Sequence, residues 1–501
     1  MPNINDTLYN LSMGYIFTFD FGSEDILHLD NKAVLDRMKD FVSGYYFISD
    51  RADIISFESY PNELLKTYKS KMYEERFKKS VLQQRKSLMI QLPTVGLNTL
   101  SYLTDASHSI AGGKLALNCT ITINEMGVGS LVLWLDYPQS ERLSSEQLLM
   151  LKHINSLHTL IDWSLGENKD LRLNGDYTIR DIAQFIIICL NASFFSSVSV
   201  QQIQISLAAN KSLNDIHKDI CGLTQKNNLV VSTDIVSYPI YHFDFRQNAT
   251  ANVQYVKQVV EDNKHLIRAL ATGDKNWDKK KPELVEKFLK ENGFTTRESI
   301  QWFTYNEGSV KIYSNELETP LLTSQVLITF ELELMLTMKH YVYKIIRNLN
   351  HFTGLMHNRF PLRTVSKFKD REMRRLDEFY NLDFIQKDTT ATRVDQFKKM
   401  LNIEEVLQIA LKKIDSLNSY MNTEFQNSSA LRQVALSVIF GTFTSGGLFY
   451  NIIRKAVENH IMFCGYSFGD MRFRYQLGLT SFLMTIVGSL ILIYFRKVRI
   501  S

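Results

Sequence analysis

Residues that mark linkers and cross-links are scarce in this sequence of 501 residues. Its 8 prolines and 22 glycines are too few for a long disordered linker. The four cysteines do not lie at the spacings of zinc ligands or redox pairs; they are Cys119, Cys189, Cys221 and Cys464. We therefore expect no disulfide framework, and a chain that works in a reducing compartment.

Motifs of common enzymes are also missing. There is no phosphate-binding glycine loop followed by Lys-Ser or Lys-Thr, no GxGxxG and no HExxH. The segment AGGKL at 111–115 contains Gly-Gly-Lys but lacks the first glycine of a phosphate loop. The 11 histidines are scattered, and Asp136 is interpreted as a turn cap. These absences predict a protein that is not an enzyme.

The sequence has neither a secretory signal nor a strong net charge. The N-terminus, MPNINDTLYNLSMGY, lacks a basic region followed by an apolar run. A net charge of +4 is too small to indicate a direct nucleic-acid partner. We expect the large N-terminal body to stay in the cytosol.

Charge is absent from two long stretches near the C-terminus. Residues 434–453 read VALSVIFGTFTSGGLFYNII, and residues 477–495 read LGLTSFLMTIVGSLILIYF. A helix of about twenty residues spans about 30 Å, the thickness of a hydrocarbon core. The pattern predicts a transmembrane hairpin at 433–496 followed by a basic tail at 497–501. Two buried core helices are the alternative.

The orientation of this hairpin follows from the size of the body more than from charge. The tail is basic, which favours a cytosolic C-terminus. The loop between the stretches is nearly as basic, with Arg454, Lys455, Arg472 and Arg474 against Glu458 and Asp470. We expect a multi-pass protein of the inner (plasma) membrane with both termini in the cytosol.

A regular apolar pattern precedes the first stretch. It steps by four and three residues through Ile403, Leu407, Ala410, Ile414, Leu417 and Met421. This is the heptad seam of helices that pack side by side. No proline or glycine interrupts residues 390–440, so one continuous helix is predicted to enter the membrane.

The same stepping continues into the uncharged stretch and mixes hydroxyl with small apolar side chains. The positions that we predict to line a pore are Ser428, Ala435, Thr442 and Ser445. Around a symmetry axis such residues would form alternating polar and apolar rings. A helix–helix contact through the same small residues is the equal alternative.

The body before these helices has mixed patterns. Strands are predicted at 15–21, 119–125, 130–137, 197–207 and 238–245, with the second and third forming a hairpin. Helices are predicted at 140–160, 185–190, 324–352 and 367–380. Ser144 or Ser145 is expected to cap the first of them. From about Asn252 onward the chain is expected to be mostly helical. The fold class is therefore α/β (α+β), with an N-terminal α/β extension at 1–130, an α/β domain at 131–320 and a helical stalk region at 321–432.

This order of elements resembles the CorA superfamily of divalent-cation channels and transporters. LWLDYPQSERLSSEQLLMLKHINSLH at 133–158 is similar to the family's strand-to-helix segment, and GLTSFLMTIVGSLILIYFRKVRIS at 478–501 is similar to its last span and basic tail. The resemblance covers roughly residues 130–501. It implies a homopentamer, with a cytosolic α/β domain, first spans around a pore and a divalent cation as a candidate ligand.

The chain departs from the family at the ion filter. The family's glycine–methionine–asparagine motif is absent, and the nearest text runs from Gly447 to Asn451, so Asn451 is the candidate for the filter asparagine. The outer loop carries a net +2, which becomes +10 in a pentamer and would repel Mg²⁺. Some CorA-like proteins without the filter belong to type III CRISPR antiviral defence. The resemblance to them implies an effector gated by a nucleotide second messenger.

Three hypotheses follow for function. The first is a CorA-like membrane channel or effector gated by a small charged ligand on its cytosolic domain. The second is a divergent divalent-cation transporter, and the third is a membrane-tethered scaffold that conducts nothing. No residue of a ligand site is identified by spacing alone.

Overall fold

The structure of the chain is a computed structural model. The structure describes residues 10–20, 44–48, 87–102, 109–124, 128–137, 143–153, 157–164, 172–194, 236–246, 248–274, 276–295, 299–316, 321–355, 366–367, 369–373, 376, 388–457, 462–463, 466–467, 475, 482 and 486. The chain divides into two compact units. The first, called the α/β unit below, is Met1–Gly354 with Asp370–Leu411, and the second is Leu355–Lys369 with Lys412–Ser501.

The α/β unit is built on one mixed sheet of eleven strands. The strand order is β7-β6-β3-β4-β5-β1-β8-β11-β10-β9, and β2 also pairs with β3. The strands are β1 (Asn10–Asp20), β2 (Gly44–Ile48), β3 (Ser87–Tyr102), β4 (Ser109–Asn124), β5 (Val128–Tyr137), β6 (Leu157–Ser164), β7 (Arg172–Thr178), β8 (Val236–Asp244), β9 (Gly293–Thr295), β10 (Ile300–Tyr305) and β11 (Gly308–Tyr313). The β8–β11 pair is parallel, and the other pairs of this sheet are antiparallel. The predicted mixed α/β class is therefore confirmed.

Strand β1 lies in the middle of this sheet and is covered on both sides. It pairs with β5 along one edge and with β8 along the other. Tyr15, Phe17 and Phe19 belong to the main apolar core, and Ile16 on the opposite face is also buried. The aromatic alternation that predicted a strand is thus confirmed, while the burial of both faces reflects the central position of β1.

The main apolar core lies on one face of the sheet. Odd-numbered residues of β1, β5 and β8 contribute to it, among them Met13, Leu133 and Phe243. Four helices add to the same core: α4 (Ser145–Met150), α5 (Ile179–Phe194), α8 (Val253–Asp262) and α9 (Lys264–Thr272). The predicted helix at 185–190 is part of α5, and its residues are buried as expected.

The predicted hairpin and the predicted strand at 238–245 are confirmed. Strand β4 pairs antiparallel with β5 from Asn124 opposite Val128 to Leu117 opposite Leu135. Position 130 lies inside β5, and the sheet joins strands from both sides of that position. The described strands of the expected 1–130 extension and of the expected 131–320 domain thus form one sheet. The predicted strand at 197–207 lies outside the described residues.

The helix predicted at 140–160 is wrong in its second half. Helix α4 ends at Met150, the chain turns at 151–152, and residues 157–164 form β6. Strand β6 pairs with β3 and β7, and these ladder hydrogen bonds outweigh the weak helical periodicity of its sequence. From Asn252 onward the described chain is mostly helical, as predicted, but β9, β10 and β11 at 293–313 extend the sheet.

The start of α4 agrees with the sequence. Ser144 is the N-cap, its hydroxyl accepts a hydrogen bond from the Gln147 amide at 3.2 Å, and the Gln147 side chain accepts one from the Ser144 amide at 2.8 Å. This reciprocal pair is a capping box, which satisfies two amides at the helix start.

Replacing Ser144 with alanine is expected to lower the free energy of unfolding by about 1 kcal/mol, because the Gln147 amide loses its acceptor. Ser144→Asp keeps an acceptor oxygen and is expected to stay near the parent protein. Thermal unfolding of the full chain measures both variants. Equal loss in both would mean that the cap contributes nothing.

The helical part of the chain begins with α11 (Leu321–Leu355), which contains the predicted helix at 324–352. At 366–376 the described positions are helical, in agreement with the helix predicted at 367–380. Helix α13 (Asp388–Met400) follows, and an edge-to-face contact of Phe397 with Trp302, 4.7 Å between ring centroids, packs it on β10. Helix α10 (Pro282–Asn292) and the short η4 (Trp277–Lys279) complete the helices of the α/β unit that have named bounds.

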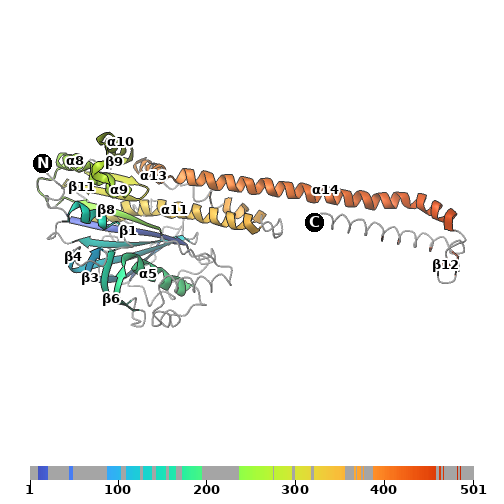
Figure 1. Cartoon of the computed structure of the whole chain (residues 1–501), viewed down its shortest axis with the longest axis horizontal. Helices are drawn as coiled ribbons and strands as arrows, with labels where there is room; N and C mark the ends of the chain where they lie inside the picture. The colour runs from blue at the N-terminus through green and yellow to red at the C-terminus, as the bar shows by residue number, and fades with distance from the viewer. Residues whose placement is uncertain are drawn as a thin grey trace. The chain divides into compact units, whose positions relative to one another are not determined.

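Helix α14 (Ile403–Val457) is one unbroken helix of 55 residues (Figure 1). The predicted continuous helix is confirmed from Ile403 to Val457, but it does not include α13. Asn402 separates the two helices with a φ of 53°, a left-handed conformation that asparagine tolerates better than most residues. The first five seam residues are buried: Ile403, Leu407, Ala410, Ile414 and Leu417.

The two predicted membrane spans stay predictions. Within the described part of the chain, no helix has the length and apolarity needed to cross a membrane. The stretch 434–453 lies in α14, where Val434, Leu436 and Ser437 are exposed. The stretch 477–495 lies outside the described residues apart from Phe482 and Ile486, which are helical and exposed.

Candidate functional site

The second face of the sheet carries buried polar side chains, and we call it the polar face. Residues paired across neighbouring strands lie on the same face. One row runs Ser12–His242–Lys311–Trp302 and a second runs Thr122–Ser130–Thr18. The buried polar residues on this face of the sheet are Ser12, Thr18, Thr122, Ser130, His242, Asp244, Thr304, Ser309 and Lys311. Buried polar and charged groups are costly, so their grouping on one face marks it as the candidate functional site.

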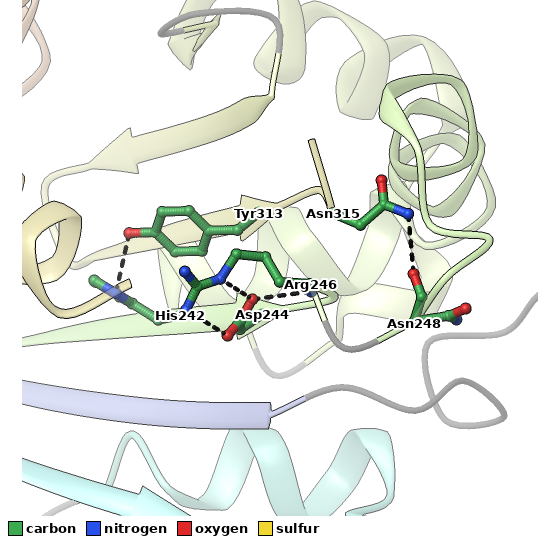
Figure 2. A network of polar contacts seen from close by, with 6 residues as sticks. All are labelled: His242, Asp244, Arg246, Asn248, Tyr313 and Asn315. Carbon is green, nitrogen blue, oxygen red and sulfur yellow. Dashed lines mark hydrogen bonds and ion pairs between the residues drawn. The ribbon is translucent and has the colours of Figure 1, made fainter. Parts of the chain in front are cut away.

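At one end of the polar face, Asp244 and Arg246 form a charged pair (Figure 2). The Arg246 Nε donates to Asp244 Oδ1 at 3.0 Å and its Nη2 donates to Oδ2 at 3.2 Å. The Arg246 amide also donates to Oδ1 at 3.0 Å. The Asp244 side chain is 4% exposed and that of Arg246 is 24% exposed. A two-point pair of this kind fixes the guanidinium at the border between the interior and solvent.

The loop after this pair is held by asparagine side chains (Figure 2). Asn315 Nδ2 donates to the carbonyl oxygens of Asn248, at 3.1 Å, and Ala249, at 2.9 Å. Asn252 caps α8 by accepting from the Tyr255 amide at 2.9 Å. The Val253 amide donates to Glu316 Oε1 at 3.2 Å, so a carboxylate already lies at the positive end of this helix.

These groups lie where the two parallel strands end. In sheets with parallel strands, ligands bind beyond the carboxyl ends of those strands. Asp244 and Tyr313, the last residues of β8 and β11, are register partners. Arg246 and the start of α8 therefore lie beyond the carboxyl ends of these two strands.

Deeper in the polar face, a lysine and a histidine are fully buried. The Lys311 ammonium lies 3.7 Å from the centroid of the Trp302 ring, which is a cation–π contact. Burial, and then the positive charge of Lys311, lower the pKa of His242 well below its usual value. His242 is therefore neutral at pH 7, and its Nδ1 lies 3.2 Å from the Tyr313 hydroxyl. Neither Lys311 nor His242 is exposed to solvent.

A glycine lets an aromatic ring reach this histidine. A Cβ on Gly14 would lie 2.8 Å from Cζ3 of Trp134, so the Trp134 ring lies against the bare backbone of β1. The Trp134 and His242 rings meet edge to face with centroids 5.2 Å apart. Together with the Tyr313 ring, 5.6 Å away, they enclose His242 in aromatic surface.

Helix α11 closes another part of the polar face with polar groups of its own. Glu333, Thr337, His340 and Lys344 recur at steps of four, three and four, which places them on one helix face, and all are buried. The Ser130 hydroxyl donates to Glu333 Oε1, and the Thr18 hydroxyl lies 3.2 Å from His340 Nδ1. Burial raises the pKa of Glu333 to about 7, although hydrogen bonds from Ser130 and Thr122 partly offset this.

The residues that the sequence predicted to line a pore lie elsewhere. Ser428, Ala435, Thr442, Ser445 and Asn451 all belong to α14. Their side chains lie outside the described part of the structure, so their pore-facing role stays a prediction.

Sequence patterns had not singled out the polar face. A signal for it exists: Lys311 interrupts the apolar strand GSVKIY, and Ser12, Thr18, His242 and Asp244 occupy alternate positions in strands of large apolar residues. Period-two polar residues usually indicate a solvent-facing side, which hides a buried polar face.

Comparisons with known proteins give no relative for this chain. No protein-family model, no curated protein and no solved structure matches it. Within the described residues, no group of three or more His, Cys, Asp or Glu side chains is placed to hold a metal ion.

Proposed function

We propose that this chain is a ligand-gated membrane effector, in which the α/β unit binds a small anionic messenger and α14 carries the response into the bilayer. The observation that supports this most is the continuity of α14. Its first residues belong to the α/β unit, while its later residues hold the uncharged stretch 434–453. A single helix shared by a binding unit and a membrane span transmits movement without a hinge.

The proposed ligand is a nucleotide second messenger bound at the carboxyl ends of β8 and β11. Arg246 is partly exposed there, and the amide at the start of α8 already stabilises the Glu316 carboxylate. A phosphate group has the charge and the acceptor oxygens that suit both. On this proposal the phosphate competes with Glu316 for the Val253 amide.

The proposed membrane part is CorA-like and homopentameric, with the first spans around a shared axis. Five copies of the α14 stripe would place Ser428, Thr442 and Ser445 toward that axis, with Ala435 between them and Asn451 near the outer mouth. The order of elements supports this arrangement: an α/β unit, long helices, one long helix with a buried seam and a basic tail.

The proposal predicts messenger-dependent leakage from liposomes that contain the full chain. Dye release is expected after a nucleotide messenger is added, and not before. Thr442→Leu is expected to abolish the release, because an apolar ring replaces a hydroxyl ring in the proposed pore.

Ser437→Leu is the control, since it also replaces a hydroxyl side chain with leucine, on the other side of the same helix. Equal loss of release in both variants would assign the stripe to helix packing. A chain that never releases dye with any messenger would instead be a tethered scaffold. Mg²⁺ flux without a messenger would identify a divalent-cation transporter.

A further inference from the structure

A row of hydroxyls crosses three neighbouring strands beneath α11. Ser130 of β5 is the register partner of Thr18 in β1 and of Thr122 in β4. All three are buried, with exposed fractions of 5% or less. Because paired residues share a face, the row presents three side-chain oxygens to whatever covers the polar face at this point.

Glu333 of α11 binds this row with its carboxylate. It accepts a hydrogen bond from Ser130 and another from Thr122, and its residue is 5% exposed. On α11 itself, Thr337 donates to the Glu333 carbonyl at 2.8 Å, and His340 contacts Thr18 instead. The sheet strands facing Glu333 thus offer hydroxyls, and the nearest titratable group on its own helix face, His340, binds a different member of the row.

The other charged side chains described in this region interact with groups other than Glu333. Lys344, further along α11, acts on Glu372, whose carboxylate binds the Arg371 guanidinium at 3.0 Å. Among the described residues, burial and the two hydroxyls are the influences on the pKa of Glu333, and no cation compensates its charge. Near pH 7 the protonated and the ionised forms of a carboxyl group in such a place differ little in free energy.

Hydroxyls suit both states of this carboxyl. A serine or threonine donates to the carboxylate and, after a rotation of its O–H bond, accepts from the protonated acid. The contact can therefore persist while its strength changes with protonation.

We infer that Glu333 and the Thr18–Ser130–Thr122 row form a proton-operated latch that holds α11 on the sheet. Protonated Glu333 is the closed state, because a neutral acid is buried at low cost. Loss of the proton leaves a buried carboxylate with hydroxyl donors alone, which favours release of α11 toward water. The latch does not depend on the proposed messenger or on the proposed membrane span.

The direction of the pH effect follows from the raised pKa. Opening exposes Glu333 to water, where its pKa returns to about 4.5, so the open state binds fewer protons than the closed state. The latch is strongest below about pH 4.5 and weakens as the pH rises from there. Well above pH 7 its strength no longer depends on pH. Between pH 6 and pH 8 the equilibrium for opening is expected to increase by about tenfold.

Hydrogen exchange of the full chain, followed by mass spectrometry on peptides from 321–355, measures this equilibrium. After correction for intrinsic exchange rates, the protection of these peptides is expected to fall about tenfold from pH 6 to pH 8. Glu333→Gln is expected to remove the pH dependence, since glutamine keeps the shape and cannot lose a proton. Protection in Glu333→Gln that still follows pH as in the parent protein would overturn the latch.

Two variants of the hydroxyl row separate a latch from simple packing. Ser130→Ala removes a donor to the carboxylate, so the protection change is expected to become larger and to continue to higher pH. Thr18→Val removes a hydroxyl from the same row that contacts His340, so its pH profile is expected to keep the parent midpoint. Equal midpoints in Ser130→Ala and Thr18→Val would also overturn the proposal. A loss of messenger response in liposomes with an intact pH profile would count against the proposed function alone.

Discussion

Trp302→Ala is expected to lower the free energy of unfolding of the α/β unit by about 3–5 kcal/mol. The Trp302 side chain is fully buried, and its Nε1 donates to the Ser309 hydroxyl at 2.6 Å. Its ring faces the Lys311 ammonium and meets the Phe397 ring of α13. Truncation therefore leaves a cavity, an ammonium without its aromatic partner and a helix without its contact on β10.

Urea unfolding of the full chain measures this loss. Trp302→Phe is the matched variant: it keeps an aromatic ring beside Lys311 and loses the hydrogen bond to Ser309. Its cost is expected to be about 1–2 kcal/mol. Tyr305→Ala tests whether the loss depends on the buried position of Trp302, because Tyr305 lies in the same strand and is 36% exposed. Equal losses of unfolding free energy in Trp302→Ala and Tyr305→Ala would mean that the contacts of the indole with Lys311 and Phe397 do not stabilise the α/β unit.

Arg246→Ala is expected to cost about 3–5 kcal/mol, since it leaves the Asp244 carboxylate buried without its cation. The arginine is partly exposed, so the cost comes mainly from the group left behind and less from the lost contact. Asp244→Ala removes the buried charge and leaves a guanidinium that can turn toward water. Its cost is expected to be smaller.

The double variant Asp244→Ala/Arg246→Ala completes a thermodynamic cycle. It is expected to be more stable than Arg246→Ala alone, because no buried charge remains. Chemical unfolding of the four proteins gives the coupling free energy. Additive losses would show that Asp244 and Arg246 act independently, and would weaken the case for a fixed guanidinium at the ligand edge.

Patterns with a short period gave correct elements. The alternation around Tyr15 and Phe17, the segment around the β4–β5 turn and the apolar run at 185–190 each became the expected strand, hairpin or helix. The heptad steps of 403–417 were likewise buried in a continuous helix. Each of these elements depends on interactions between residues a few positions apart. The periodicity of apolar residues in the sequence reflects such interactions directly.

Where the local sequence does not settle whether a segment is helix or strand, pairing within the sheet decided its structure. Residues 157–160 fit the end of a helix in the sequence, but β3 and β7 provide hydrogen-bonding partners on both sides. Residues 300–313, for which the sequence had suggested no strand, form β10 and β11, which pair with each other while β11 also pairs with β8. Strand preference is set by such partners more than by the residues themselves.

The polar face could not be predicted from spacing. Its contacts join residues far apart in the chain: Ser130 and Glu333 are 203 positions apart, and Thr18 and His340 are 322 apart. Each residue alone is an ordinary serine, threonine, histidine or glutamate. Only their enclosure between the sheet and α11 removes water from them and shifts the pKa of Glu333.

The sequence by itself determined the local elements of this protein: the central strand, the capped start of α4, the buried α5 and the long seam-bearing helix α14. Hydrophobic periodicity and capping act over a few residues, so a linear pattern is enough to specify them. The tertiary structure alone decided which strands join the sheet, which face is polar, and where Lys311, His242 and Glu333 are buried. Desolvation depends on everything packed around a group, and that surrounding is assembled from segments hundreds of residues apart.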